Sequence, residues 1–299
     1  MSLVVIINPV AGTANSDDAA RSRSRLAKKT LEAAGIDAEV RVTERPGHAC
    51  EIARDAVARG VSLVVAWGGD GTVNEVGRSL IFSSTSLGIV PAGSGNGLAR
   101  YLRIASNPAE ALLGAVRGHD RSIDAGEIGG RPFFNIAGIG FDASVARRRR
   151  IHRGGWRGLW DYAVAVVREF RAFEPEECTI TTDTDTGIAR CRAFIMAFAN
   201  SGQYGYGALV APSARVDDGV LDLVVIEPAT VAGNLWRLVR LFTGTFDRAR
   251  GVRAAKMREA MVEAAHPMLF HTDGEPAEGG RALAVRVHPR ALRIRVADV

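Results

Sequence analysis

The sequence predicts an α/β domain with a parallel sheet over residues 1–124 and an antiparallel β-rich domain over residues 125–299. In the first part, apolar runs of strand length alternate with longer stretches of helical character. This alternation is typical of a parallel sheet covered by helices on both faces. In the second part, short β-branched or aromatic segments are separated by turn residues, which indicates antiparallel strands. The length of 299 residues suits two domains.

Each apolar run within the first domain predicts a strand, and most of the stretches that follow predict a helix. The first helix is expected to end at Gly35, because glycine readily adopts the left-handed conformation that closes a helix. Strands are expected at 3–7, 38–43, 62–66 and 87–90, and helices at 16–34, 48–58 and about 72–80.

The second domain shows a different pattern, in which strands dominate and two helical stretches interrupt them. Strands are expected within 131–136, 178–182, 192–199, 220–226 and 292–296, and helices at 156–172 and roughly 231–243. We find no internal repeat and no low-complexity linker in the sequence.

The composition excludes several classes of protein. Hydrophobic residues make up 47% and charged residues 24%, which excludes collagen-like and disordered chains. The net charge is +5, and the basic side chains are almost all arginine, since lysine occurs only at Lys28, Lys29 and Lys256. A Walker A loop needs a lysine after a glycine, and no lysine here follows one. If the protein binds nucleotide phosphates, it does so without that lysine.

The cysteines and the apolar segments bear on the cellular compartment. Three widely spaced cysteines without a C-x-x-C pair favour neither a disulfide framework nor a zinc ribbon, and they suit a reducing cytosol. The apolar start lacks a basic region and a small-residue cleavage site, so we interpret it as a strand rather than a signal peptide. The longest apolar helical stretch is far shorter than the roughly 20 residues of a membrane span. We therefore expect a cytoplasmic protein, soluble or peripheral at the membrane.

Glycine-bearing loops follow three of the predicted strands, at 8–12, 68–72 and 91–97. Ligands of parallel sheets bind beyond the carboxyl ends of the strands, where all three loops lie. Glycines allow backbone N–H groups to approach phosphate oxygens, and a following helix N-terminus adds a positive dipole end. Asp70, within the second loop, could be linked to Mg²⁺, serve as part of the base machinery, or cap a tight turn. Three such loops at one sheet edge favour a nucleotide site.

Two turns of the second domain also carry carboxylates. The stretch 271–276 (HTDGEP) contains Asp-Gly, the commonest hairpin signal, so a plain hairpin is the default interpretation. Its flanking carboxylates could instead face an acceptor hydroxyl, if the two domains close on a cleft. The stretch 215–221 (RVDDGVL) is also a candidate hairpin. Its carboxylates and bent backbone carbonyls could hold a hard cation.

The ordered set of motifs resembles the diacylglycerol kinase catalytic-domain family, which includes bacterial lipid kinases, sphingosine kinases and ceramide kinases. The motifs are NPVAG near the N-terminus, GGDGTVNEV at 68–76, PAGSGNGLAR at 91–100, IDAGEI at 123–128, FNIAGIGFDASV at 134–145, the DDGVLDL stretch and TDGEP. The resemblance spans nearly the whole chain. It implies a nucleotide-binding α/β domain and a C-terminal antiparallel β-sandwich domain, with ATP in the cleft between them and transfer of its γ-phosphoryl group to a lipid hydroxyl.

The resemblance also assigns roles to residues of this chain. Glu275 looks like the proton acceptor, with Asp70 as its close partner or competitor, and with Asp273 in the same motif. A magnesium ion would be held by the carbonyls of Arg215 and Val220 and by the Asp218 carboxylate. The implied nucleotide contacts are Asn8, Pro9, Gly12, Thr43, Gly68, Gly69, Asp70, Gly71, Thr72, Asn74, Glu75, Gly93, Ser94 and Asn96.

Asp124 lies at the predicted domain junction. It could act as a carboxylate behind the catalytic residues, and a capping or hinge role is an equal alternative.

The chain departs from the family pattern in its third glycine loop. The usual Gly-Thr-x-Asn-Asp-Phe-Ala is here Gly93-Ser94-Gly95-Asn96-Gly97-Leu98-Ala99. Serine keeps the hydroxyl, whereas Gly97 removes a carboxylate that could help to organise the water around Mg²⁺. GSGN resembles the sphingosine kinase branch and GGDGTVNEV resembles bacterial members, so the lipid acceptor stays open between diacylglycerol, a sphingoid base and other lipid alcohols.

Two other functions remain as alternatives. NAD kinase shares a similar GGDGT loop, but a second Asn-Glu motif would be expected well downstream, and Asn74-Glu75 follows the loop directly. A non-catalytic lipid- or nucleotide-binding protein would be favoured by loss of Glu275 or Asp70, and both are present.

An arginine-rich run suggests contact with an anionic membrane surface. Residues 147–157 contain six arginines and no acidic residue, among them Arg147, Arg148, Arg149, Arg150 and Arg153, together with Trp156. Basic residues are attracted to anionic lipid and tryptophan favours the headgroup layer. A solvated basic loop is the alternative.

Nucleic acid is not expected as a partner, because interleaved stacking aromatics are missing. An exposed strand edge could support a homodimer.

Overall fold

The computed structural model describes residues 2–12, 16–151, 170, 173–184, 189–205 and 208–297. The chain forms two compact units. Unit 1 contains Met1–Ala125 and Pro289–Val299, and unit 2 contains Gly126–His288. The predicted division after residue 124 falls beside the observed one. Residues 289–299, which the sequence assigns to the second domain, lie in unit 1, because the last strand of the chain pairs with a strand of that unit.

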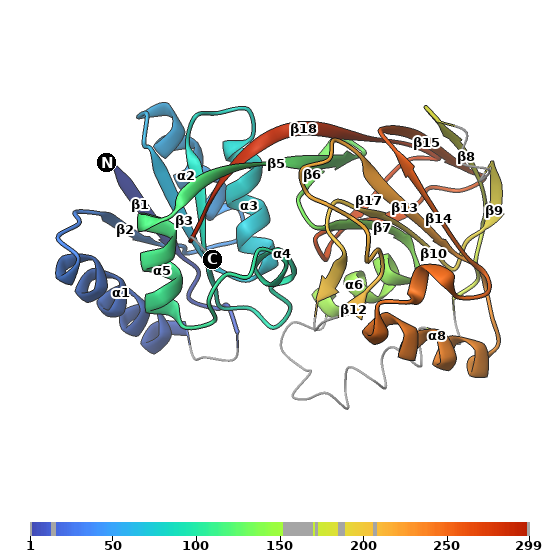
Figure 1. The fold of residues 1–299 in the computed structure, drawn as a ribbon, viewed down its shortest axis with the longest axis horizontal. Coiled ribbons are helices and arrows are strands. Elements are labelled where there is room, and N and C mark those ends of the chain that lie inside the picture. Colours follow the sequence, from blue (N-terminus) through green and yellow to red (C-terminus); the bar gives the residue numbers. More distant parts are fainter. Residues whose placement is uncertain are drawn as a thin grey trace. The chain divides into compact units, whose positions relative to one another are not determined.

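A parallel sheet forms the centre of unit 1, as the sequence predicts (Figure 1). Its first four strands are β1 (Leu3–Ile7), β2 (Glu39–Val42), β3 (Leu63–Gly68) and β4 (Ser86–Pro91). They lie in the order β2-β1-β3-β4. Every residue of β1 and β3 is buried, which explains why these strands are continuous apolar runs instead of alternating ones.

The helices of unit 1 are α1 (Ser16–Ala33), α2 (His48–Ala58), α3 (Asp70–Leu80), α4 (Gly97–Tyr101) and α5 (Pro108–Arg117). α1 packs with α5, and α2 packs with α3. Leu63, Val65 and Trp67 of β3 share one apolar core with side chains of α1 and α5. The intervening residues of β3 therefore face the other side of the sheet, because successive side chains of a strand point to opposite faces.

Two long strands run from one unit into the other along the chain. They are β5 (His119–Ile128) and β18 (Ala282–Val296). The end of β18 lies parallel to β4, where Ile294 is opposite Leu87, whereas its start pairs antiparallel with β15 (Glu259–Ala264) in unit 2. Each unit therefore completes its sheet with part of β18.

Unit 2 is a β-sandwich, which confirms the predicted fold class. Its six-stranded sheet has the order β14 (Val252–Met257), β13 (Leu221–Ile226), β10 (Ile195–Ala199), β7 (Ile136–Gly140), β16 (Leu269–Thr272) and β17 (Glu275–Glu278). All neighbours in this sheet are antiparallel. The facing strands include β8 (Glu177–Thr182), β9 (Arg190–Arg192), β15 and the start of β18. Phe198 and Phe270 of one sheet share a buried core with Ile180 and Val262 of the other.

The remaining elements of unit 2 are short or lie at the ends of strands. They are β6 (Arg131–Phe133), α6 (Phe141–Ile151), β11 (Gln203–Gly205), β12 (Ala208–Leu209), α8 (Val231–Thr243) and a 3-10 helix at Phe246–Arg248. The predicted helix at 231–243 is confirmed.

The predicted helix at 156–172 and most of the arginine-rich run lie outside the described residues. Within the described part of that run, residues 147–151 form the end of α6, and the side chains of Arg147 and Arg148 are exposed and partly exposed, respectively. Arg153 and Trp156 are outside the described residues. Across the part of the chain that the structure describes, no helix is both long enough and apolar enough to span a membrane.

Asp124 anchors the last strand of unit 1. Its side chain lies on β5 and is fully buried, and its Oδ1 accepts a hydrogen bond of 2.7 Å from the backbone N–H of Arg290. Arg290 has a φ of 52°, so the carboxylate stabilises β18 at a residue in a left-handed conformation. Of the two roles that the sequence leaves open for Asp124, this geometry favours the structural one.

Replacing Asp124 with alanine should lower the free energy of unfolding by about 2 kcal/mol or more, because the Arg290 amide loses a fully buried, charged acceptor. Urea unfolding measures this change. Asp120→Ala is the matched control, since Asp120 joins the same two strands through Arg295 at 2.8 and 3.0 Å but is 39% exposed. An exposed ion pair contributes about 1 kcal/mol or less.

The Asp120 control also has a predicted pH dependence. The hydrogen bond from Arg295 lowers the pKa of Asp120. A lowered folded-state pKa gives stability that is present at neutral pH and is lost as the pH falls through that pKa. Equal losses in Asp124→Ala and Asp120→Ala at pH 7 would contradict the anchoring role of Asp124.

Candidate active site

The three glycine loops lie side by side in unit 1. They follow β1, β3 and β4, which are parallel neighbours, so their carboxyl ends meet at one edge of the sheet. The structure thus brings together the loops at 8–12, 68–72 and 91–97, as the sequence predicts. It also shows that the second loop is shorter than predicted, because α3 begins at Asp70 and not at Thr72.

Asp70 joins the second loop to the third. Its Oδ2 accepts a hydrogen bond from the backbone N–H of Asn96 and its Oδ1 accepts one from Gly97, both at 2.8 Å. Asn96 has a φ of 50° and immediately precedes α4, so the Asp70 carboxylate satisfies the first amides of that helix. Of the three roles considered for Asp70, the geometry supports a capping role, although the capped backbone belongs to a different loop.

The glycines at this edge permit close packing between the loops. A Cβ at Gly93 would lie 2.6 Å from the Cα of Gly69, and a Cβ at Gly95 would lie 2.7 Å from Asp70 Oδ2. Any side chain at Gly93 would therefore push two backbones apart. The sequence suggested glycines for close approach to a ligand, and the structure adds that these two positions are needed for loop-to-loop contact.

The first loop is held by a residue that the sequence analysis did not identify. The guanidinium of Arg23 on α1 donates to the carbonyl oxygens of Asn8 and Ala11, at 2.5 and 2.7 Å. Asn8 in turn donates from Nδ2 to Thr72 Oγ1 at 2.8 Å, which links the first loop to the second. Burial lowers the pKa of Arg23. The only sequence signal for this role is an arginine about two helical turns into α1.

The start of α3 is the part of the edge best suited to an anion. Its N-cap is Gly69, which has no side chain to cap the first amides of the helix. Such amides, together with the helix dipole, bind phosphate groups. By contrast, the N–H groups of Gly93, Asn96 and Gly97 already donate to Asn96 Oδ1 or to Asp70.

The other predicted nucleotide contacts surround this helix start. Thr43 follows β2, is buried, and donates its N–H to the carbonyl of Ile7. Asn74 is buried within α3, whereas Ser94 is exposed. Glu75 Oε1 accepts from the N–H of Gly47 at 3.2 Å, which fixes the loop before α2.

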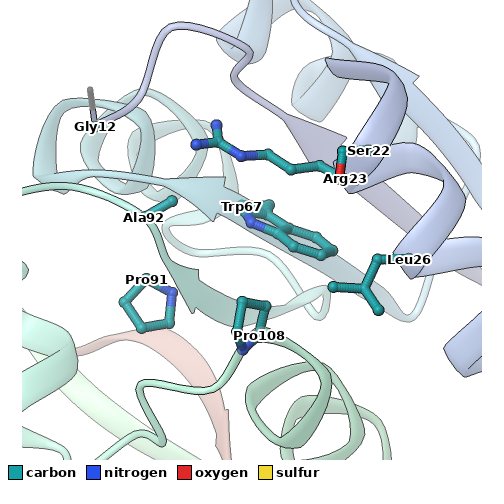
Figure 2. Close-up of a pocket in the computed structure, with 8 residues that line it drawn as sticks. All are labelled: Gly12, Ser22, Arg23, Leu26, Trp67, Pro91, Ala92 and Pro108. Carbon is teal, nitrogen blue, oxygen red and sulfur yellow. The ribbon is translucent and has the colours of Figure 1, made fainter. Parts of the chain in front are cut away.

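A pocket of about 420 Å³ lies beside the loops within unit 1 (Figure 2). The side chains around it are mainly apolar, with Arg23 as its charged member, and Figure 2 shows the guanidinium directed toward Gly12. The lining residues are Gly12, Ser22, Arg23, Leu26, Trp67, Pro91, Ala92 and Pro108. The pocket contains residues of the first and third glycine loops, Gly12, Pro91 and Ala92.

In unit 2, the TDGEP stretch forms the predicted hairpin. Thr272 and Glu275 are paired across it, and the two central residues, Asp273 and Gly274, have φ values of 51° and 84°. Positive φ at both central positions identifies a type I′ turn, for which Asp-Gly is a preferred sequence. Glu275 is the first residue of β17 and is partly buried.

Asp273 is partly exposed, and its carboxylate is bound to backbone. Its two carboxylate oxygens accept hydrogen bonds of 2.9 to 3.1 Å from the N–H groups of Phe134, Asn135 and Ile136. The geometry therefore supports an anchoring role for Asp273, in which it fixes the turn to the start of β7. Of the two carboxylates in this motif, Glu275 is the one that remains a candidate for proton transfer.

The turn at 215–220 carries the residues expected to hold magnesium. Two backbone carbonyls and the Asp218 carboxylate suit a hard cation in kind. However, the ammonium of Lys256 lies 3.0 Å from Asp218 Oδ2 and 3.0 Å from Asp222 Oδ2. Lys256 and Asp222 are direct partners in the β13–β14 pair, so the backbone register places this charge.

Lys256 therefore already supplies positive charge to the carboxylates at this turn. Burial lowers the pKa of Lys256, but hydrogen bonds to Asp222 and Asp218 outweigh it and raise the pKa overall. A divalent cation at Asp218 would compete with the ammonium. Among the described residues, no group of three or more His, Cys, Asp and Glu side chains is arranged to hold a metal ion.

Comparisons with known proteins agree with both units. The sequence matches the family "Diacylglycerol kinase catalytic domain" over residues 2–128 and "YegS C-terminal NAD kinase beta sandwich-like domain" over residues 135–296. It is 34% identical over 275 residues to "Probable lipid kinase YegS-like" of Pseudomonas aeruginosa, covering 91% of this chain and 89% of that one. A protein of the same description from Chromohalobacter salexigens is 30% identical over 271 residues, covering 88% and 85%.

Solved structures show the same fold. A structure described as diacylglycerol kinases from Bacillus anthracis has a TM-score of 0.73 at 18% identity, covering 99% of this chain and 96% of that chain. A second structure from that organism has a TM-score of 0.78 at 21% identity. The two units thus define a protein of the diacylglycerol kinase fold. Taken with the sequence matches, the chain belongs to the YegS-like lipid kinase family.

The role of Lys256 can be tested by thermal unfolding in EDTA and in MgCl₂. The Lys256→Met variant should unfold at a lower temperature, because Asp218 and Asp222 lose their neutralising charge. It should regain more stability from Mg²⁺ than the wild-type protein does, since the cation no longer competes with an ammonium. Lys28→Met, an exposed residue on α1, is the matched control. A wild-type protein that depends on Mg²⁺ as strongly as Lys256→Met would contradict this account.

Proposed function

We propose that this protein is an ATP-dependent lipid kinase that transfers the γ-phosphoryl group of ATP to the hydroxyl group of a lipid. The observation that carries the proposal is the edge of unit 1, where hydrogen bonds interlock three glycine loops and α3 begins after a glycine N-cap. Membership of the YegS-like lipid kinase family supports the same reaction class.

The phosphate groups would bind to the first amides of α3. Asp70 is fixed to the third loop and Asn8 to Thr72, so these amides are held in place before a ligand arrives. Preorganised donors of this kind stabilise the charge that develops on transferring phosphoryl oxygens. This arrangement takes the place of the phosphate-binding lysine that the chain lacks.

Glu275 is our candidate for the proton acceptor. The competing carboxylates, Asp70 and Asp273, both accept hydrogen bonds from backbone amides, and these bonds favour a structural role for them. A lipid alcohol is a poor acid, so a carboxylate within about 3 Å of it would accept the proton late in phosphoryl transfer. The proposal requires Glu275 of unit 2 to reach the acceptor hydroxyl in the reacting complex.

Magnesium bound to the nucleotide would neutralise charge on the phosphate groups during transfer. In this chain, Lys256 pairs with Asp218 of the 215–220 turn and with Asp222 of β13, so we assign that turn a role in the fold of unit 2.

The acceptor belongs to the class of lipid alcohols, with diacylglycerol and sphingoid bases as the candidates that the motifs suggest. An enzyme acting on such a substrate must reach a membrane surface. We propose peripheral attachment, with the arginines at 147–150 as part of the contact.

Assays of ATP-dependent lipid phosphorylation can separate the roles of the two carboxylates. Glu275→Gln should lower kcat by roughly 10²-fold or more, with little change in nucleotide affinity, because a general base is lost. Asp70→Asn should raise KM for ATP about tenfold, since one loop amide loses its acceptor. Glu278→Gln, an exposed change on the same strand as Glu275, should leave both values unchanged.

A mixed-micelle panel of lipid alcohols with radiolabelled ATP provides the readout. If Asp70→Asn abolishes turnover at saturating ATP while Glu275→Gln retains it, the assignment of the proton acceptor is wrong. If the wild-type protein phosphorylates no lipid alcohol in the panel, the proposed function fails.

A further inference from the structure

Three hydrogen-bonded side chains, Tyr204, Asp142 and His271, connect to the turn that immediately precedes Glu275. Tyr204 donates from its hydroxyl to Asp142 Oδ2 at 2.7 Å, and His271 Nε2 lies 3.0 Å from the same oxygen. Asp142 is in the first turn of α6, Tyr204 is on β11, and His271 is on β16. His271 is 4% exposed, so solvent does not satisfy its ring nitrogens.

The imidazole connects this group to the turn. The backbone N–H of Gly274 donates to His271 Nδ1 at 3.3 Å. A backbone N–H can only donate, so Nδ1 must carry a lone pair, and the ring proton of neutral His271 is on Nε2. Nε2 therefore donates to Asp142, and the tautomer of His271 is fixed by its two partners.

The Asp142 carboxylate is itself held in place. Its Oδ1 accepts from the N–H of Ala143 at 2.8 Å, and its Oδ2 accepts from Tyr204 and His271. Burial and the nearby Asp142 charge raise the pKa of Tyr204 well above its ordinary value, so its hydroxyl remains a donor. Every polar atom in the path from Tyr204 to Gly274 thus has a defined donor or acceptor role.

A glycine makes room for this contact. Gly138 on β7 is directly opposite His271 in the sheet, and a Cβ at that position would collide with Asp142 Oδ2 and lie 2.8 Å from His271 Nε2. The absence of a side chain at Gly138 therefore leaves the space in which the imidazole and the carboxylate form their contact.

We propose that His271 is a positioning residue for the proton acceptor, in which Asp142 orients the imidazole and the imidazole holds the Gly274 amide next to Glu275. This inference rests on the proposed function of Glu275. Asp273 fixes the first central residue of the turn through the amides at 134–136, and His271 fixes the second. Two independent contacts on adjacent residues restrict the direction in which the Glu275 carboxylate points. Misplacement of a reacting group by about 1 Å can lower a rate 10²-fold.

Two substitutions separate the two bonds of His271. In His271→Asn, the amide oxygen takes the place of Nδ1, so the acceptor for Gly274 is retained while the contact with Asp142 is lost. In His271→Gln, the amide nitrogen takes the place of Nε2, so the contact with Asp142 is retained while the acceptor for Gly274 is lost. Lipid phosphorylation, thermal unfolding and hydrogen exchange of the Gly274 amide are measured for both variants and for the wild-type protein.

We expect His271→Gln to lower kcat about 10- to 100-fold with KM for ATP unchanged, and to speed exchange of the Gly274 amide. His271→Asn should stay within a few-fold of wild-type kcat, even if both variants lose similar thermal stability. Equal losses of kcat in the two variants, following their loss of stability, would overturn the positioning role.

Hydrogen exchange distinguishes failure of this inference from failure of the proposed function. If the wild-type protein phosphorylates no lipid, faster exchange at Gly274 in His271→Gln than in His271→Asn would still support the link between His271 and the turn. The same exchange rate at Gly274 in both variants and in the wild-type protein would overturn that link.

Discussion

The hydrogen bonds from the Asn96 and Gly97 amides to the Asp70 carboxylate are the interaction on which the candidate site depends. They join two loops that are separated along the chain, and they satisfy the start of α4. They also commit two amides of the third loop to a protein acceptor. The amides at the start of α3 are therefore the ones that we propose to bind the phosphate groups, because Gly69 provides no side-chain cap.

Unit 2 uses a carboxylate in a comparable way. Asp273 binds three consecutive backbone amides and so fixes a type I′ turn to the neighbouring strand. At Asp70-Gly71 and at Asp273-Gly274, the aspartate is thus a structural acceptor for backbone N–H groups. The neighbouring Glu275 is the first residue of the strand that follows its turn, and it is the carboxylate that we propose as the proton acceptor.

Much of the fold could be predicted from the sequence, and the partners of the site residues could not. Buried parallel strands give continuous apolar runs, so β1, β3 and β4 and the loops after them were correctly located. The amides bound by Asp70 lie 26 and 27 residues away, and those bound by Asp273 lie up to 139 residues away. Periodicity reports which face of an element is buried, whereas such pairings depend on tertiary packing. The return of β18 to unit 1 was missed for the same reason, since its residues carry no signal for the strand they join.

An amide-resolved NMR titration with Mg²⁺ and a non-hydrolysable ATP analogue shows which loop amides bind the phosphate groups. We expect the Gly71 and Thr72 amide signals to shift as the phosphate groups bind, while the Asn96 and Gly97 amides keep slow hydrogen exchange because Asp70 retains them. Shifted and rapidly exchanging Asn96 and Gly97 amides, with Gly71 and Thr72 unmoved, would contradict this expectation.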